Sequence, residues 1–279
     1  MNESILPVTQ FLEDSFVYSC SFDKQRGHEQ FVPHHTLAFQ FSGETHIQLS
    51  KGTLVLRENQ MLLARGNQLT KSTKIPGKDK EYKSMSILLT DAVLRQFAAN
   101  NPSGSKKIYS GENNILLKPD ALMEGYFHSL LPYIEQSKSI SRKLTEIKID
   151  EAIELLLNLS PDLKNFLFDF TEPFKIDLEK FMLQNYHFNV PIENFARLTG
   201  RSLAGFKRDF EKAFQTSPRK WLQEKRLEEA YRIIHMENKK PADIYIDLGF
   251  ENLSHFYTCF KKKYGTTPAE SLTIKKITK

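Results

Sequence analysis

Lys207 and Arg208 lie side by side on the predicted outward face of a short helix. The stretch ARLTGRSLAGFKRDFEKAF covers residues 196–214, and its apolar residues recur at the spacing of one helix face. Burial of that face turns Ala204, Lys207 and Arg208 outward. Arginine can donate two hydrogen bonds to the edge of a guanine, and lysine can reach bases or phosphates. A solvated protein surface would explain one such helix equally well.

The same pattern recurs 50 residues further along the chain. Residues 191–218 and 241–268, aligned without a gap, share eight identical residues in 28 positions. The identities are Pro191/Pro241, Leu198/Leu248, Leu203/Leu253, Phe206/Phe256, Phe210/Phe260, Lys212/Lys262, Thr216/Thr266 and Pro218/Pro268. Both bounding prolines and the apolar positions are kept together, which indicates a duplicated structural unit.

Each copy predicts two short helices joined by a turn. The first helix ends near Gly200 or Gly249, and the second begins at Ser202 or Asn252, whose side chains can accept a hydrogen bond from a free backbone N–H. This is the helix-turn-helix plan, whose second helix enters the major groove of DNA. The outward residues of the second copy are Ser254, His255, Tyr257, Thr258 and Lys261. Two copies together favour DNA binding over a solvated surface.

A longer helix is predicted between the copies, over about residues 218–235, with Trp221 on its core side. Its length is about 24 Å at 1.5 Å per residue. A rod of that length can hold two recognition helices near the spacing of about 34 Å between successive major grooves. Gly205, inside the first recognition helix, costs about 1 kcal/mol relative to alanine. The sequence leaves open whether its backbone approaches DNA or a neighbouring helix.

The charge of the chain is uneven along its length. Residues 172–279 carry 20 Lys and Arg against 14 Asp and Glu, whereas residues 1–171 carry 19 against 20. A basic C-terminal part is typical of nucleic-acid binding, although lysine-rich surfaces also arise for solubility. The sequence contains no run of about 18 apolar residues, so no membrane span is predicted. The N-terminus does not read as a secretory signal, and Cys20 and Cys259 suggest no disulfide framework, so we expect a cytoplasmic protein.

The N-terminal part has a different period. Residues 1–90 read as short alternating strands rich in β-branched and aromatic residues, and residues 91–170 read as helices. Strands are expected at 15–22, 36–42, 45–50, 53–56, 60–64 and 82–90, and helices at 91–99, 120–136 and 143–159. We therefore predict a cupin-like β-barrel or sandwich plus helices, then a linker over 171–177 and an all-α domain with two helix-turn-helix motifs.

Two motifs in the C-terminal part are specific. Leu222, Arg226, Leu227 and Ala230 form the pattern Leu-x-x-x-Arg-Leu-x-x-Ala, and DLGFENLSHFYTCFKKKYGTTP covers residues 247–268. With the first repeat, they resemble the DNA-binding domain of the AraC/XylS family of bacterial transcription regulators over roughly residues 174–272. The resemblance implies helix-turn-helix motifs at about 191–214 and 241–264, with recognition helices in successive major grooves.

Carried over by position, the resemblance assigns roles to the outward residues. The residues expected to read bases are Ala204, Lys207, Arg208, Ser254, Tyr257 and Thr258. The residues expected to contact phosphates are Arg201, Ser202, Asn252, His255 and Lys261. Thr258 departs from the longer polar or basic residue that many members carry there. The second helix is therefore expected to contribute more to phosphate binding than to base reading.

The resemblance also implies a function for residues 1–170. Family members combine a cupin-like barrel with a helical dimerisation region, and this layout is most similar to the subgroup of type III secretion activators, which a protein partner can control. The expected partners are promoter DNA, RNA polymerase, a second copy of the chain, and a small-molecule or protein effector, with no membrane and no cofactor. The helix over 143–159 spreads its leucines over more than one face, which favours a dimer contact or an antagonist protein over core packing alone.

Two other classes of protein share features with this sequence. A metal-dependent cupin enzyme with an appended non-specific DNA-binding domain would draw on His28, His34, His35 and His46. His34 and His35 are adjacent, however, and would point to opposite faces of a strand. A DNA-repair methyl acceptor needs a reactive cysteine in a metal or active-site motif, and neither Cys20 nor Cys259 has one. We therefore expect a transcription regulator with no catalytic or metal site.

Overall fold

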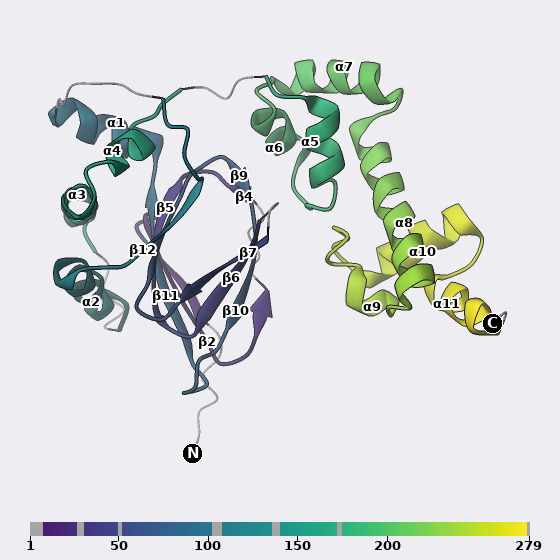
Figure 1. Cartoon of the computed structure of the whole chain (residues 1–279), viewed down its shortest axis with the longest axis horizontal. Helices are drawn as coiled ribbons and strands as arrows, with labels where there is room; N and C mark the ends of the chain where they lie inside the picture. The colour runs from purple at the N-terminus through teal and green to yellow at the C-terminus, as the bar shows by residue number, and fades with distance from the viewer. Residues whose placement is uncertain are drawn as a thin grey trace. The chain divides into compact units, whose positions relative to one another are not determined.

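The computed structural model describes residues 8–26, 31–49, 52–101, 108–135, 140–171 and 175–277. The chain divides into two compact units, Met1–Thr171 and Glu172–Lys279. The first is built of strands followed by helices and the second of helices (Figure 1). The predicted fold class, a β-barrel or sandwich with helices and an all-α domain, is confirmed.

The described strands of the first unit form two principal antiparallel sheets. The six-stranded sheet has the order β1 (Val8–Leu12), β2 (Phe16–Ser21), β11 (Tyr82–Leu89), β5 (His35–Ser42), β8 (Met61–Ala64) and β12 (Asn114–Leu117). The four-stranded sheet has the order β3 (Gln25–Arg26), β10 (Lys71–Ile75), β6 (Glu44–Leu49) and β7 (Gly52–Arg57), and β4 (Phe31–Val32) pairs with β9 (Gln68–Leu69). In the central pair, Met85 of β11 lies opposite Phe39 of β5.

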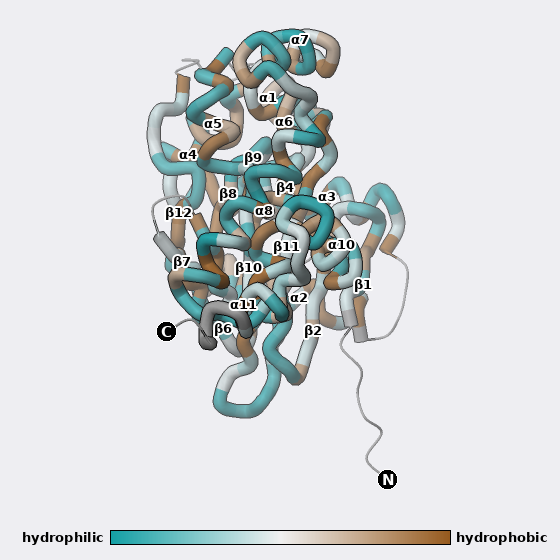
Figure 2. The backbone as a smooth tube through the Cα atoms, turned by 90° about the vertical axis from the view of Figure 1, so that its right-hand side faces the viewer, coloured by the Kyte–Doolittle hydropathy of each residue, from teal (hydrophilic) through white to brown (hydrophobic). Residues whose placement is uncertain are grey.

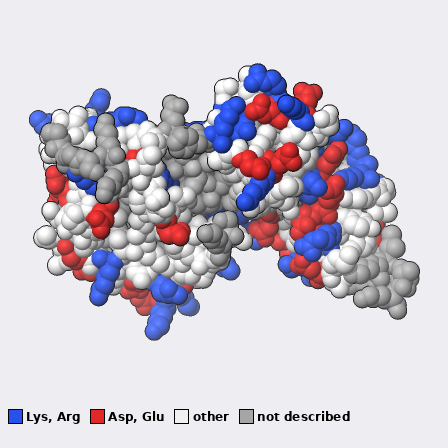
Figure 3. All heavy atoms as spheres, turned by 45° about the horizontal axis from the view of Figure 1, so that its top comes forward, with Lys and Arg blue, Asp and Glu red and all other residues white. Residues whose placement is uncertain are grey.

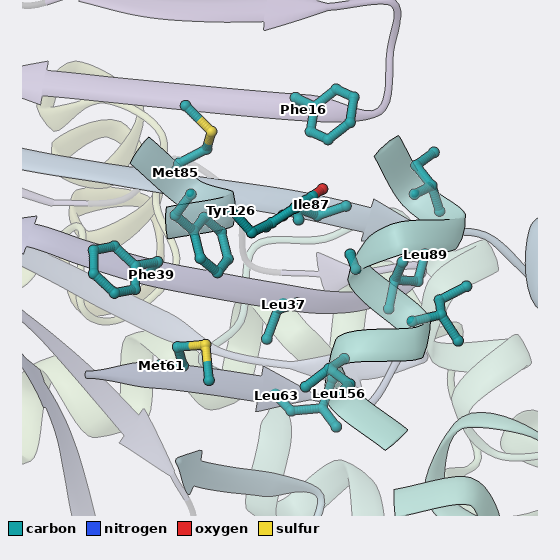
Figure 4. Close-up of a cluster of buried hydrophobic side chains, with 14 of the residues drawn as sticks. Phe16, Leu37, Phe39, Met61, Leu63, Met85, Ile87, Leu89, Tyr126 and Leu156 are labelled. Atoms are coloured by element: carbon teal, nitrogen blue, oxygen red, sulfur yellow. The ribbon is translucent and has the colours of Figure 1, made fainter. Parts of the chain in front are cut away.

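One face of the six-stranded sheet carries the main core. Alternate residues of β5 are buried, as a period of two requires, and Leu37 and Phe39 have no exposed surface. They pack with Tyr126 and Leu156 from the helices, as Figure 4 shows. The covering helices are α1 (Asp91–Asn100), α2 (Ala121–Glu135), α3 (Arg142–Leu159) and α4 (Leu163–Leu167). In Figure 2 apolar and polar stretches alternate along strands and helices alike.

The opposite face of this sheet meets the four-stranded sheet. Leu62 and Ala64 of β8 cluster there with Ile47 of β6 and Leu56 of β7. A cavity of about 250 Å³ lies between the sheets. Its lining includes Lys74, whose ammonium group bonds to the hydroxyl of Ser19 and lies 5.6 Å from the centre of the Tyr82 ring.

The leucines of α3 are largely accounted for by the core of their own unit. Leu156 is fully buried, and Leu155, Leu157 and Leu159 are half-buried against the same cluster. Packing within the unit thus explains most of the distribution of leucines over more than one face of α3, which had suggested a contact with a second protein chain. Exposed apolar surface remains at Ile147 of α3, which is 51% exposed, and at Leu122 of α2, which is 65% exposed.

The structure adds elements that the sequence patterns did not predict. β1, β10 and β12 were missed because their residues are only partly buried or exposed, which weakens the alternation. The short α4 was missed because its five residues are too few to show a helical period. The expected strand over 45–50 and the linker over 171–177 fall partly outside the described residues, at 50 and at 172–174.

The histidines that the structure describes differ in their surroundings. His35 opens β5, is 7% exposed and places its ring 5.4 Å from that of Phe166. Burial, with a contribution from Arg65, lowers the pKa of His35 to about 4, so its ring is neutral at pH 7. His34 precedes the strand, His46 bonds to Glu44, and His28 lies outside the described residues. Among the residues that the structure places, no group of three or more His, Cys, Asp or Glu is arranged to hold a metal ion.

An ion pair anchors the end of the first unit to its sheet. Asp169, whose side chain is 2% exposed, lies 2.5 Å from Nη2 of Arg65, just after β8. It also accepts hydrogen bonds from the hydroxyl and backbone N–H of Thr171 and from the backbone N–H of Tyr109. Burial opposes ionisation of Asp169, but these bonds outweigh it and lower its pKa. The chain is thereby fixed immediately before residues 172–174.

Asp169→Asn is expected to lower the free energy of unfolding of this unit by about 2 kcal/mol at pH 7, below the cost for a fully buried pair because Arg65 is partly exposed. A lowered folded-state pKa stabilises above the unfolded-state pKa, and the stabilisation is lost as pH falls through the folded value. The difference from wild type should therefore vanish in acid, as measured by calorimetry between pH 7 and 3. Asp162→Asn is the control, because Asp162 is exposed at the N-cap of α4 and its side chain makes no capping hydrogen bond; an equal loss there would contradict the ion-pair account.

Candidate nucleic-acid interface

The second unit repeats one arrangement on either side of a long helix. The first helix-turn-helix consists of α6 (Ile192–Leu198) and α7 (Leu203–Phe214), preceded by α5 (Leu178–Asn185). The connecting helix is α8 (Pro218–Glu237). The second motif consists of α9 (Pro241–Ile244) and α10 (Leu253–Tyr264), followed by α11 (Pro268–Ile277). Figure 1 shows α8 joining the two motifs.

The apolar stripe of α7 is buried as its spacing predicts. Phe206 and Phe210 have no exposed surface, and the Trp221 ring of α8 lies 5.6 Å from that of Phe210 and 4.6 Å from that of Phe214. Trp221 is 6% exposed and is a core residue, as expected. The turn before α7 contains Gly200 in the left-handed region, at φ 66°.

The second motif buries the equivalent stripe, but its first helix is shorter than predicted. Phe256 and Phe260 of α10 are fully buried against a cluster that includes Leu227, Ala230 and Ile234 of α8. α9 ends at Ile244, and residues 245–249 continue as turns, whereas the sequence suggested a helix through 248. Two aspartates and three β-branched or aromatic residues at 243–247 have weak helix propensity, which explains the early end.

Both recognition helices begin with the predicted caps. The Ser202 hydroxyl accepts from the backbone N–H of Gly205 at 3.2 Å, and Asn252 Oδ1 accepts from that of His255 at 2.8 Å. A Cβ on Gly205 would lie 3.1 Å from Ser202 Oγ. This contact is tight, but the equivalent cap in the second motif is made to His255, which carries a full side chain. The cap alone therefore does not require a glycine at 205.

The residues predicted to read bases lie on the outward side of both helices. Ala204, Lys207, Arg208, Ser254 and Thr258 are exposed, and Tyr257 is half-buried against the second core cluster. Arg208 has a side chain that is 79% exposed, with Asp209 3.7 Å away. The hydroxyl of Thr258 donates to the carbonyl of Ser254. The first helix thus presents two long cations, and the second presents smaller polar groups.

The predicted phosphate contacts divide into two kinds. Ser202, Asn252, His255 and Lys261 are exposed at or near the N-terminal ends or flanks of the recognition helices. Arg201 is different, because its side chain is 11% exposed. Its guanidinium donates to Asp209 Oδ2 and to the carbonyls of Thr199 and Ile176. These bonds make Arg201 a support for the turn before α7, and its role as a phosphate contact stays a prediction.

Cations and carboxylates are interspersed over this unit. Figure 3 shows Lys and Arg beside Asp and Glu on the visible face of the helical part. On α8, Arg232 pairs with Glu229 at 2.7 Å and with Glu237 at 3.1 Å, so its charge is balanced locally. Within the described part of the chain, neither Lys207 nor Lys261 forms a salt bridge, although Lys261 helps to lower the pKa of Glu270. Both ammonium groups can therefore meet an external anion.

A half-buried arginine connects the two motifs. Arg226 of α8 donates to the carbonyl oxygens of Tyr186 and Phe188, before α6, and of Gly249, in the turn of the second motif. All three distances are 2.8–2.9 Å. Burial lowers the pKa of Arg226 to about 10, so the side chain stays charged at neutral pH. The motif Leu-x-x-x-Arg-Leu-x-x-Ala had singled out this residue, but no sequence signal gave its role.

Two family models match the chain. The model for the ExsA N-terminal regulatory domain matches residues 35–168, and a helix-turn-helix domain model matches residues 195–273. The geometry and these matches define a DNA-binding transcriptional regulator. The predicted resemblance to AraC/XylS-type regulators is confirmed, and the N-terminal part matches the regulatory domain of ExsA.

The chain is also similar to individual proteins over most of its length. The chain is 27% identical over 249 residues to the thermoregulatory protein LcrF of Yersinia pestis, with 86% of each chain covered. It is 24% identical over 234 residues to the regulator ExsA of Pseudomonas aeruginosa, with 82% of each covered. A crystal structure of ToxT from Vibrio cholerae matches 94% of this chain and 96% of that one, with 12% identity and a TM-score of 0.45. Within the described residues, no helix is long and apolar enough to cross a membrane.

Ser202→Ala is expected to lower the free energy of unfolding of the second unit by about 1 kcal/mol, because the N–H of Gly205 loses its partner. Fluorescence of Trp221, the only tryptophan in the chain, reports unfolding of this unit in denaturant. Ser217→Ala is the matched control, since Ser217 precedes α8 without a side-chain capping bond. Equal destabilisation by both substitutions would contradict the capping role.

Proposed function

We propose that the protein activates transcription by placing α7 and α10 in successive major grooves of promoter DNA. The observation that carries this is the pair of capped helices, each with its apolar face buried on α8 and its polar face exposed. Lys207 and Arg208 read bases in the first groove. Ser254, Tyr257 and Thr258 make the smaller contacts in the second, and Ser202, Asn252, His255 and Lys261 lie near phosphates. The protein bound at the promoter recruits RNA polymerase in the cytoplasm, and no catalytic step is involved.

Control is exerted through residues 1–170, and two features of the first unit support it. The cavity between the sheets has hydroxyl groups and the ammonium group of Lys74, which suit a small polar or anionic molecule. The exposed apolar side chains Leu122 and Ile147 on α2 and α3 suit a second copy of the chain or a regulatory protein.

The primary test is selection of random duplex DNA by the full chain, followed by titration of the recovered sequence at several salt concentrations. Two preferred blocks about one helical turn apart are expected, because the motifs read two grooves. Affinity should fall steeply as the salt concentration rises, because binding releases counterions from the DNA and this release is less favourable in high salt. Weak binding of all sequences alike would remove sequence reading from the proposal.

Lys207→Ala combined with Arg208→Ala is expected to lower affinity for the selected duplex about 30-fold or more, since each lost base contact costs about 1–3 kcal/mol. Affinity for random duplex should fall much less, so discrimination between the two is reduced. Fluorescence anisotropy with both duplexes measures the ratio. Lys212→Ala, one turn nearer the end of α7, should leave discrimination unchanged. Undiminished discrimination in the double variant would exclude these residues from base reading.

A further inference from the structure

We propose that Arg226 fixes the separation of the two helix-turn-helix motifs, and thereby determines which spacing between two DNA half-sites the protein accepts. The inference rests on the proposed two-groove reading of DNA. Arg226 does not touch DNA in this scheme. It is a positioning residue that acts through the backbone on which each recognition helix is mounted.

The geometry of the guanidinium is the first argument. It is planar and presents its donors in a fixed fork, so it can hold several acceptors in one arrangement. Here Nε and Nη2 bond to the carbonyls of Tyr186 and Phe188, on the segment that enters the first motif. Nη1 bonds to the carbonyl of Gly249, in the second motif. One rigid group thus ties both motifs to the same point of α8.

The chemistry of these bonds is the second argument. Their acceptors are backbone carbonyls, and bonds from a charged donor are about twice as strong as neutral ones. The bonds therefore locate main chain rather than a mobile side chain. Lysine at this position has a single flexible ammonium group and cannot reproduce the fork.

The surroundings of Arg226 are the third argument. A cleft of about 560 Å³ separates the start of α6 from the turn of the second motif, with α8 also lining it. At the edge of this cleft, Asn189 Nδ2 donates to Glu251 Oε1 at 3.2 Å. Asn189 is half-buried and Glu251 is exposed. The main apolar contacts of α7 and α10 are with α8. α8 carries both motifs, and across the cleft the Arg226 bonds fix how the main chain of each is held against that helix.

The glycine in the second turn fits the same role. Gly249 has φ 87°, and a Cβ there would lie 2.9 Å from the Arg226 guanidinium carbon and 2.8 Å from the carbonyl oxygen of His187. The turn can approach the guanidinium this closely only because it lacks a side chain.

The experiment measures the affinity of the full chain for the selected duplex and for versions with one or two base pairs inserted or removed between the blocks. Wild type should bind the native spacing at least about tenfold more tightly than the shifted ones, because a displaced helix loses base contacts. In Arg226→Lys this ratio should fall at least about fivefold, since a looser connection tolerates other spacings. Arg232→Lys, an exposed arginine on the same helix, should keep the wild-type ratio.

The readout separates positioning from folding. A variant that merely unfolds in part loses affinity for every spacing by the same factor, so an unchanged ratio in Arg226→Lys would overturn the inference. Trp221 fluorescence gives the folded fraction, and Arg226→Gln, with a neutral amide, is the second variant. Unfolding of both variants would assign Arg226 to folding alone and equally overturn it. If wild type shows no preference for spacing, the two-groove reading itself fails.

Discussion

The helical unit depends on one constraint, which is that short amphipathic helices are not stable until they bury their apolar faces. α7 and α10 have twelve residues each, a length that is marginal for an isolated helix. Their phenylalanines are covered by α8, with Trp221 on one side and Leu227, Ala230 and Ile234 on the other. α8 is therefore core for both motifs at once, and the exposed faces are free to differ between the copies.

This division between buried and exposed helix faces explains why the repeat could be recognised in the sequence. Three of the eight shared pairs, Phe206/Phe256, Phe210/Phe260 and Pro218/Pro268, are buried in both copies, because both copies solve the same packing problem. The outward positions, Lys207 and Tyr257 for example, have no such restraint. The caps were also predictable, because serine or asparagine before an apolar run has a local physical meaning.

What the sequence did not predict depends on contacts between distant segments. The commitment of Arg201 to Asp209 and two carbonyls follows from the fold of the turn, which no spacing rule describes. The same holds for Arg226, which bonds to Tyr186, 40 positions earlier in the chain, and to Gly249, 23 positions later. In the first unit, the weakly alternating strands β10 and β12 acquire their places only by pairing, with β6 and β8 respectively. Local patterns therefore identified elements, while the roles of the buried polar groups required the three-dimensional structure.

The close fit between Gly249 and Arg226 has a consequence for how sequences of this kind can diverge. Any side chain at 249 would collide with the guanidinium and with the carbonyl of His187, besides straining a backbone at positive φ. Any shorter residue at 226 would leave the carbonyl of Gly249 without its donor. The fitness effect of a change at one position hence depends on the residue at the other. Lineages should keep this arginine–glycine pair intact or lose both members together, even while the DNA-facing residues around them are exchanged freely for new operators.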